Sequence, residues 1–467
     1  MRCRIDFKYA LCLELDDPGF HHSVLTDFRD RLLEDDRADA LLDLALERIK
    51  EAGLVTERGT ARTDSTYVLA HARDLTTLEL VSEAIRATLE ELARDGSPLL
   101  DALIDEEWAE RYGRPVRLGK QPTRPAARLK QAGQDAHLLL RAVIDDGPRG
   151  RQAEALRQIF LQYFLVEGNG RARPRTEKDG LPPGSRRIVS PYETEARWAI
   201  RGDTRWCGYL VHATETCDPD SPNVITDVAT TGPVKDSEEL PAIHDRLERR
   251  GLLPEEHLAD GGYVTVGLLE AAATRGVTLT GPVKDSGSWQ QRRGDGFARE
   301  DFHIDFDKRQ VTCPRGKTSG NWLELPSQAP YTLVRFDKRY CDPCPDRERC
   351  TRSREGRSIS FLPRHLHERQ QTNRAQQQDP QWLRTYGSRA GVEGTMSEIV
   401  NGHAGRRCRY RGQAKTHVQH VLTAIAINIE RLDAHESPEH RPRQLTSFQG
   451  YLVKHGYSIP RWWRGKN

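Results

Sequence analysis

The segment TARTDSTYVLA, residues 60–70, combines β-branched and aromatic residues with a single acid, Asp64. This composition predicts a β-strand, because such side chains fit the pleated surface of a sheet. The segment before it, DALLDLALERIKEAG (39–53), has apolar residues at helical spacing and ends at Gly53, which predicts a helix. Asp64 is either a polar residue at a strand edge or part of a site, and only distant segments of the chain can decide between the two.

The composition is that of a soluble globular protein with much polar surface. Of the 467 residues, 30% are charged and 36% are hydrophobic, and the net charge is only +2. No apolar run reaches the roughly 18 residues that a membrane-spanning helix requires. The N-terminus lacks the basic and apolar pattern of a secretion signal. The sequence therefore predicts a cytoplasmic protein without a membrane segment.

Further strand candidates follow downstream. CGYLVHATE (207–215) and NVITDVATT (223–231) are joined by a turn-rich segment and predict a hairpin. A helix over 237–251 comes next, and then a short strand that leads into Asp260. This order favours one interrupted α/β core over independent domains in series.

The predicted organisation has three parts. The expected boundaries are an N-terminal helical segment at 1–55, the α/β core at 56–432 with a helical insertion at 76–190 and a cysteine-bearing insertion at 286–360, and a basic C-terminal tail at 433–467.

Three acids are candidates for one catalytic site. Asp260 ends a strand in LADGG, where the glycines allow a tight turn at the sheet edge. Tyr386, Arg389 and Glu393 are spaced by three and four positions, which places them on one face of a helix. With Asp64, these acids would give Mg²⁺ its oxygen ligands. Two such ions would activate the attacking oxygen and stabilise the leaving oxygen of a phosphodiester.

Several motifs, taken in order, carry a family resemblance. TDSTYVLA, WCGYLVHATETCD, NVITDVATT, HLADGGY and the Y-x2-R-x3-E pattern of TYGSRAGVEGT resemble bacterial insertion-sequence DDE transposases, and the insertion sequence 1182 family in particular. The resemblance covers nearly the whole chain. It implies a ribonuclease-H-like catalytic fold and an Asp-Asp-Glu triad that binds two Mg²⁺, for which Mn²⁺ can substitute.

The resemblance also implies roles for individual residues. Asp64 matches the first Asp of the triad, Asp260 the second, and Glu393 the Glu. Tyr386 and Arg389 match the tyrosine and arginine that precede the Glu in related transposases.

The first acid has a rival. SPYETEARWAI (190–200) holds Glu193 just ahead of the hairpin, where relatives often read Asp-Pro-Asp/Glu-Ala. A glutamate there would be one methylene longer than the aspartate it replaces, enough to disturb a two-metal geometry. We favour Asp64, because a strand-like segment holds it, whereas Glu193 lies in a loop-like segment.

The chain also departs from the family pattern. Val400 stands where relatives often have a lysine, seven residues after the Glu, and Leu210 stands where a lysine often follows the glycine-tyrosine pair. Related proteins usually begin with a longer helical DNA-binding segment, so this chain is expected to be shortened at its N-terminus.

A basic segment near the C-terminus predicts contacts with DNA phosphates. Residues 401–420 contain no acid, and the tail SIPRWWRGKN is also basic. A solvated basic surface is the alternative interpretation. The candidate DNA-binding residues are Arg406, Arg407, Arg409, Arg411 and Lys415.

Four clustered cysteines form a possible Zn²⁺ site. CDPCPDRERC supplies Cys341, Cys344 and Cys350, and Cys313 lies upstream. A CxxC turn can offer two thiolates to one tetrahedral ion, although CxxCx5C is not a standard zinc-finger spacing. Four reduced cysteines that pack a small subdomain are the alternative.

The sequence thus predicts a DNA transposase that acts on double-stranded DNA, at element ends and target, as a homodimer or higher oligomer associated with the bacterial nucleoid. Two alternatives remain open. One is a truncated, inactive DNA-binding remnant, and the other is a metal-dependent nuclease of the same fold that cuts but does not join.

Overall fold

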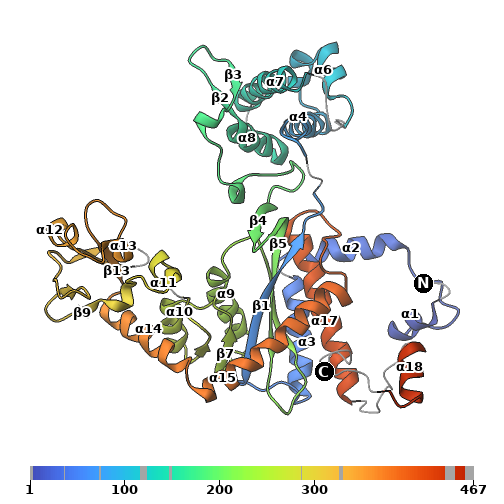
Figure 1. The fold of residues 1–467 in the computed structure, drawn as a ribbon. Helices are drawn as coiled ribbons and strands as arrows, with labels where there is room; N and C mark the ends of the chain where they lie inside the picture. Colours follow the sequence, from blue (N-terminus) through green and yellow to red (C-terminus); the bar gives the residue numbers. More distant parts are fainter. Residues whose placement is uncertain are drawn as a thin grey trace.

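The computed structural model describes residues 4–35, 37–72, 75–115, 124–146, 150–284, 287–325, 330–436 and 447–457. A central sheet carries helices on both sides, a helical bundle stands above it, and a cysteine-bearing subdomain projects to one side (Figure 1). Along the described part of the chain, no helix is both long and apolar enough to cross a membrane. The basic tail SIPRWWRGKN lies outside the described residues.

The central sheet has the spatial order β6-β5-β1-β7-β8, with β4 also paired to β5. β5 is antiparallel to β1, β4 and β6, whereas β7 is parallel to β1 and β8 is parallel to β7. β6, β1, β7 and β8 therefore run in one direction and end at the same edge. The strands are β1 (Thr60–Leu69), β4 (Arg197–Arg201), β5 (Thr204–Thr216), β6 (Ile225–Thr231), β7 (Glu256–Ala259) and β8 (Thr278–Thr280).

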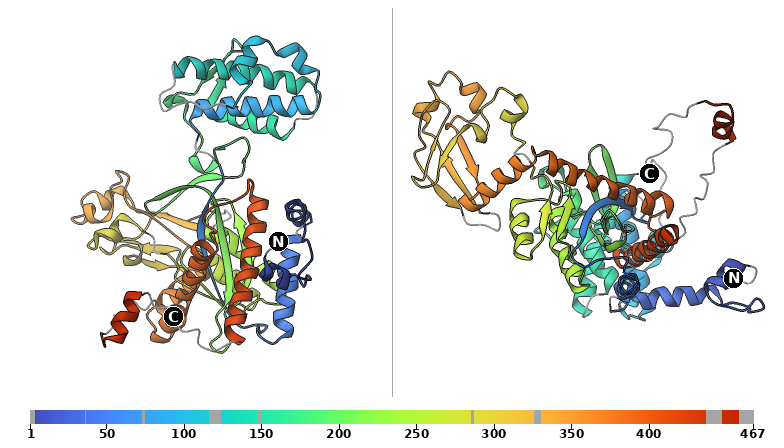
Figure 2. Two further views of the ribbon diagram at one scale, coloured as in Figure 1. Left: turned by 90° about the vertical axis from the view of Figure 1, so that its right-hand side faces the viewer. Right: turned by 90° about the horizontal axis from the view of Figure 1, so that it is seen from below.

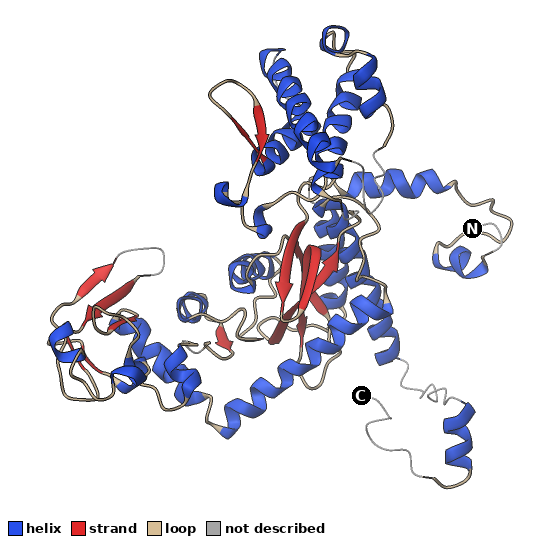
Figure 3. Ribbon diagram, turned by 45° about the horizontal axis from the view of Figure 1, so that its top comes forward, coloured by secondary structure: helices blue, strands red, loops and turns tan. Residues whose placement is uncertain are grey.

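These strands agree with several sequence predictions. The strand predicted around Asp64 is confirmed as β1, and the predicted hairpin is confirmed as β5 and β6. β1 lies between β5, with which it pairs over Ala61–Leu69, and β7, with which it pairs over Thr60–Thr63. It is therefore an interior strand of the sheet, and Figure 3 shows the strands of this sheet in red with helices around them.

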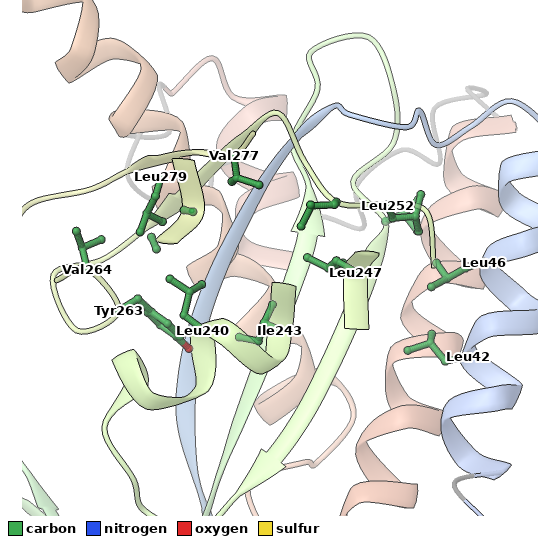
Figure 4. Packing of buried hydrophobic residues seen from close by; sticks show 14 of the residues in the cluster. Leu42, Leu46, Leu240, Ile243, Leu247, Leu252, Tyr263, Val264, Val277 and Leu279 are labelled. Atoms are coloured by element: carbon green, nitrogen blue, oxygen red, sulfur yellow. The ribbon is translucent and has the colours of Figure 1, made fainter. Parts of the chain in front are cut away.

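Helices cover both faces of the sheet. α16 packs against β1 and α17 against β6, while α9 also contacts β6 and α3 packs on α17. The largest core joins the apolar faces of α3, α9 and α17 to β7 and β8, and Figure 4 shows Leu42, Leu247 and Leu279 among its members. The helices next to the sheet have the bounds α3 (Arg37–Glu51), α9 (Asp236–Arg249), α10 (Val266–Thr274), α16 (Gly391–Ser397) and α17 (Gln413–Glu436).

The segment between β1 and β4 forms a helical bundle with a core of its own. Thr76 and Glu79 make a capping box at the start of α4, and Leu139, Leu156 and Ile159 are fully buried inside the bundle. The bundle stands apart from the sheet in the side view of Figure 2. Its elements are α4 (Thr77–Arg94), α5 (Leu99–Leu103), α6 (Glu106–Tyr112), α7 (Pro125–Asp146), α8 (Arg151–Tyr163), β2 (Phe164–Val166), β3 (Ala172–Pro174), η1 (Glu177–Asp179) and η2 (Gly184–Arg186).

The cysteine-bearing segment folds around a small core of its own. Phe302, Phe336 and Phe361 lie at the centre of this core. Its elements are α11 (Trp289–Arg293), η3 (Arg299–Asp301), β9 (His303–Asp305), β10 (Gln310–Thr312), β11 (Leu323–Leu325), β12 (Tyr331–Arg335), α12 (Lys338–Cys341), α13 (Arg347–Cys350) and β13 (Ser358–Phe361).

The C-terminal third is helical, but its helices are divided. The one helix face expected for Tyr386, Arg389 and Glu393 spans three elements, α15 (Pro380–Gly387), η4 (Ser388–Ala390) and α16. Gly387 and Gly391 flank the tighter middle turn, and glycine weakens a helix interior. The other helices are α1 (Ile5–Ala10), α2 (His22–Leu32), α14 (Arg364–Gln376), the π-helical turn η5 (Glu398–Gly402) and α18 (Ser447–Lys454).

A buried ionic network fixes α16 and α17 on the sheet. Glu215 of β5 is fully buried and pairs with Arg62 of β1 at 2.6 Å and with Arg431 of α17 at 2.8 Å. The Thr395 hydroxyl of α16 donates to the same carboxylate. Arg62 also donates to the carbonyl of Ser388 at 2.7 Å. A Cβ at Gly391 would lie 2.1 Å from the Arg62 guanidinium, so only glycine leaves room for this contact.

Replacing Glu215 should test how far the fold depends on this network. Glu215→Gln leaves two buried or half-buried guanidinium groups without their counter-charge, so we expect the free energy of unfolding to fall by about 3–5 kcal/mol. The exposed Arg48–Glu51 pair provides the control, because Glu51→Gln should cost less than about 1 kcal/mol. Urea denaturation of the three proteins measures both changes. Equal small losses would mean that the network does not hold the fold.

Candidate active site

Asp64 and Asp260 lie side by side at the edge where the parallel strands end. The pairing of β1 with β7 ends at Thr63 and Ala259. Asp64 follows Thr63 inside β1, which continues to Leu69, and Asp260 is the first residue after β7. Neighbouring strands are about 4.8 Å apart, and residues in register point to the same face. The Asp260 carboxylate accepts a hydrogen bond from the Gly262 amide at 2.7 Å, which holds it in the turn.

Arg389 brings the third predicted acid to this place. Its guanidinium lies 3.7 Å from the Asp64 carboxylate and donates to Glu393 at 2.9 Å, one helical turn further on. Arg389 and Asp64 are each 14% exposed, whereas the Glu393 side chain is 62% exposed. The Tyr386 ring lies 6.0 Å from the same guanidinium. Arg389 is thus the common neighbour of the predicted residues.

A further acid, Asp236, lies at the same edge, and the sequence analysis did not identify it. It is the first residue of α9 and accepts a hydrogen bond from the Ser65 hydroxyl at 2.8 Å. A Cβ at Gly262 would lie 2.7 Å from an Asp236 oxygen and 2.8 Å from an Asp260 oxygen, so both carboxylates lie against Gly262, where a larger residue would not fit. An acid in the first turn of a helix is common, and therefore its sequence position carries no distinct signal.

The charges at this edge perturb one another. Burial raises the pKa of Asp64, and the neighbouring Asp260 charge adds to this, while Arg389 opposes it. Burial likewise raises the pKa of Asp236, with a smaller contribution from Asp260. Burial alone would lower the pKa of Arg389, but Asp64, Tyr386, Asp260 and Glu393 outweigh it and raise that pKa. Carboxylates that repel one another and share one arginine are typical of a site that takes a cation.

The donor set fits a hard divalent cation, although it is not gathered into a cage. Within the residues that the structure describes, no group of three or more His, Cys, Asp or Glu side chains has the arrangement of a metal site. Arg389, which pairs with both Asp64 and Glu393, provides the positive charge among these acids. Carboxylate oxygens are nevertheless the ligands that Mg²⁺ and Mn²⁺ prefer.

Glu193, the rival for the first acid, has different surroundings. Its side chain is fully buried, accepts a hydrogen bond from the Tyr209 hydroxyl at 3.1 Å and lies 3.4 Å from the Gly412 amide. Burial raises its pKa, and the charges that act on it are His71 and Arg411. None of the interactions described for Glu193 involves Asp64 or Asp260, so the geometry favours Asp64 as the neighbour of Asp260.

The predicted DNA-binding residues divide into two groups. Arg406 is held inside the protein, because it donates to Thr66 and to the Tyr67 carbonyl and stacks 3.9 Å from the Tyr67 ring centroid. The Arg406 guanidinium is therefore already bound by residues near the end of β1. The clustering of basic residues in the sequence did not indicate these contacts. The remaining residues are exposed: Arg407, Arg409, Arg411, which lies over the Tyr192 ring, and Lys415, which pairs with Asp30.

The four predicted cysteine ligands surround one small cavity. Cys313, Cys341, Cys344 and Cys350 all line a space of about 40 Å³ within the cysteine-bearing subdomain, and all four are thiols without a disulfide. Burial raises the pKa of Cys350 to about 11, and the other three thiols act in the same direction. The fold therefore brings together four residues that are spread over nearly forty positions of sequence.

The raised pKa of Asp64 has a consequence for stability. A carboxyl whose pKa is higher in the folded protein stabilises the fold fully below about pH 4, its unfolded pKa, and loses that contribution as the pH rises through the folded value. Asn resembles the protonated form, so Asp64→Asn should raise the melting temperature at neutral pH without divalent ions. The gain should shrink towards about pH 4.

Asp179→Asn provides a control of opposite sign. Hydrogen bonds from Arg173 and Thr176 lower the pKa of Asp179, so its replacement should lower the melting temperature at neutral pH and matter less in acid. Thermal denaturation across this pH range measures both. A loss of stability in Asp64→Asn at neutral pH would show that the attraction of Arg389 exceeds the cost of burial.

One comparison with known proteins identifies part of the chain. Residues 312–433 match the family model described as "Transposase DDE domain". This span contains Tyr386, Arg389 and Glu393, but it begins after Asp64 and Asp260 and therefore includes neither of them. None of the curated proteins matches the chain significantly. The matched segment, which carries the predicted Glu of the triad, supports a DDE transposase.

Proposed function

We propose that the chain is a DDE transposase that cleaves DNA at the ends of a mobile element and transfers the freed strand into target DNA, with Asp64, Asp260 and Glu393 as its catalytic triad. The observation that carries this proposal is the register of β1 and β7, which sets Asp64 and Asp260 beside each other, with Arg389 linking Asp64 to Glu393. The match of residues 312–433 to a transposase DDE domain supports the same conclusion.

The triad would hold two Mg²⁺, or Mn²⁺ in their place. When bound, the ions supply activation of the attacking oxygen and charge stabilisation of the leaving oxygen. Arg389 then exchanges its carboxylate partners for a phosphate of the DNA, since a guanidinium binds carboxylate and phosphate with the same fork geometry. Tyr386, half-buried beside Arg389, positions the backbone next to that phosphate.

Two chemical steps follow from this arrangement. Water attacks a phosphodiester at the element end, and the bond to the 3′ oxygen breaks to free a 3′-hydroxyl. That hydroxyl then attacks a phosphodiester of the target in line and displaces its 3′ oxygen. The energy of the phosphodiester is conserved in the second step, so no further cofactor is required.

The finer assignments rest on the resemblance of the motifs. We assign the chain to the insertion sequence 1182 family, with a ribonuclease-H-like core. The sheet order β6-β5-β1-β7-β8, with β5 alone reversed among these five strands, supports this core. A homodimer or higher oligomer on DNA, in the bacterial cytoplasm at the nucleoid, agrees with two element ends being joined to one target.

Replacing the triad should abolish the chemistry and leave DNA binding intact. Asp260→Asn and Glu393→Gln should each lower nicking of DNA from the regions that flank the gene by about a thousandfold or more in Mg²⁺ or Mn²⁺. Glu90→Gln provides a control, because Glu90 is exposed on α4 and pairs only locally with Arg86. Gel assays of nicking and of joining with a pre-cleaved end measure the two steps separately.

The same assays distinguish the alternatives. A protein that binds DNA but neither nicks nor joins it in either metal is an inactive remnant. A protein that nicks but does not join a pre-cleaved end is a nuclease. Either result would contradict the proposal, as would full activity in Asp260→Asn.

We also propose that the four cysteines bind one structural Zn²⁺. The backbone amide of Lys317 points at Cys313 Sγ from 3.4 Å, and Arg315, Lys317 and Arg357 line the same cavity, so donors and cations already face the sulfur atoms. Four thiolates would repel one another without a cation, and binding of Zn²⁺ deprotonates thiols and draws them together. The core of this subdomain is small and supplies limited stability, so a bound metal ion would add stability that the core alone does not provide.

Metal analysis tests this site directly. Protein purified without chelators should contain about one zinc ion per chain, and Cys344→Ser and Cys350→Ser should lose it. Cys217→Ser is the control, because Cys217 follows β5 and lies outside the cysteine-bearing subdomain. Replacement of zinc by Co²⁺ should give the absorption of a tetrahedral thiolate site. A zinc-free protein that takes up no Co²⁺, or zinc retained by both serine variants, would contradict the assignment.

A further inference from the structure

One seven-residue sequence occurs twice in this chain. TGPVKDS spans residues 231–237 and again residues 280–286. Each copy begins at the last residue of a strand, Thr231 of β6 and Thr280 of β8. The structure describes the first copy completely and the second as far as Lys284.

The sheet topology places the two copies around the candidate active site. β6 and β8 run parallel to β1 and β7, so all four end at one edge. In the sheet order, β1 and β7 stand between β6 and β8. One copy of TGPVKDS therefore leaves the sheet on each side of Asp64 and Asp260.

Both copies line the same cleft. A space of about 780 Å³ is bordered by residues 233–237 of the first copy, by Val283 and Lys284 of the second, and by the turn at Gly261 and Gly262 that follows Asp260. The cleft thus borders the turn that directly follows Asp260, and Asp236 also lines it. Arg201 also lines it and donates to the Ser65 carbonyl at 3.1 Å.

The cleft combines cations at its rim with apolar walls. Lys235 is 83% exposed, with only a loose contact to Glu238 at 4.0 Å, and Lys284 is exposed as well. The walls include Ile200, Val264 and Leu366. Such a combination suits a chain with a charged backbone and flat apolar groups, whereas a polar small molecule would leave the walls without partners.

We propose that the two TGPVKDS segments form a clamp for one DNA strand, in which Lys235 and Lys284 bind backbone phosphates on either side of the phosphodiester presented to Asp260. This inference rests on the proposed function, because it assigns the substrate strand to the cleft beside the same acids. Matching lysines at matching strand ends give the strand two equivalent contacts. The carboxylates between them remain available for the reacting phosphate.

DNA binding by lysine variants tests the clamp without relying on catalysis. The probe is a fluorescent duplex from the DNA that flanks the gene, and the protein carries Asp260→Asn so that the probe is not cut. Lys235→Ala and Lys284→Ala should each weaken binding several-fold and lower the slope of log K against log salt by about one. Arg at either position should restore both values. Lys308→Ala is the control, because Lys308 is 77% exposed in the cysteine-bearing subdomain.

A photo-crosslinking residue in place of Val234, which is 42% exposed beside Lys235, gives a second measurement that does not require either lysine variant to fold. Crosslinks to nucleotides next to the cleaved position support the clamp. An unchanged salt slope in the double lysine variant, or crosslinks only to distant nucleotides, would overturn it. A protein that never nicks DNA but shows both lysine effects contradicts the proposed function alone, and one that nicks normally without both lysines contradicts the clamp alone.

Discussion

The buried carboxylate of Glu215 is the contact on which the candidate site depends. It receives Arg62 from the strand that carries Asp64, Thr395 from the helix that carries Glu393, and Arg431 from α17. A buried charge of this kind is tolerated only when every partner is present. The same interaction that satisfies it therefore fixes α16 against β1, and so fixes where Glu393 can reach. Arg62 adds a second constraint, because it also holds the Ser388 carbonyl next to Arg389.

Arg389 gives the acids a common counter-charge in the absence of metal. Asp64 and Asp260 would otherwise repel one another at a partly buried sheet edge, where burial already raises the pKa of Asp64. The cations that oppose the raised pKa of Asp236 are Arg201 and Lys284 instead. The Arg389 guanidinium compensates for this repulsion while Glu393 remains exposed on the surface of α16. An arginine in this position can be displaced from the carboxylates by cations and still find a partner in the phosphate of the substrate.

The local sequence pattern was sufficient to predict some of these structural features but not others. β1 could be predicted because Thr60–Leu69 is rich in residues that favour strands, and α9 because its apolar residues recur at helical spacing. That Asp64 lies beside Asp260 could not be derived from pattern, since nearly two hundred residues separate them and strand pairing is not local. The family resemblance, rather than periodicity, supplied that pairing. The helix changes to a tighter turn at Ser388–Ala390, and Arg406 contacts Thr66 of β1. Both features depend on packing against β1, which the spacing of residues in the sequence does not reveal. Asp236 was missed because an acid that begins a helix is ordinary in sequence.

The order and direction of the strands place the acids and the lysines at different positions along one edge of the sheet. Four strands run in the same direction; Asp64 lies within β1, Asp260 directly follows β7, and the outer strands β6 and β8 lead into Lys235 and Lys284. β6 is two strand positions from β1 and β8 is next to β7, so the two outer strands are about 19 Å apart. A DNA strand carries one negative charge per nucleotide, so a strand that spans both lysines places intervening phosphates near the carboxylates. Because the reacting phosphate must approach like charges, attraction on either side of it offsets part of the repulsion before any metal binds.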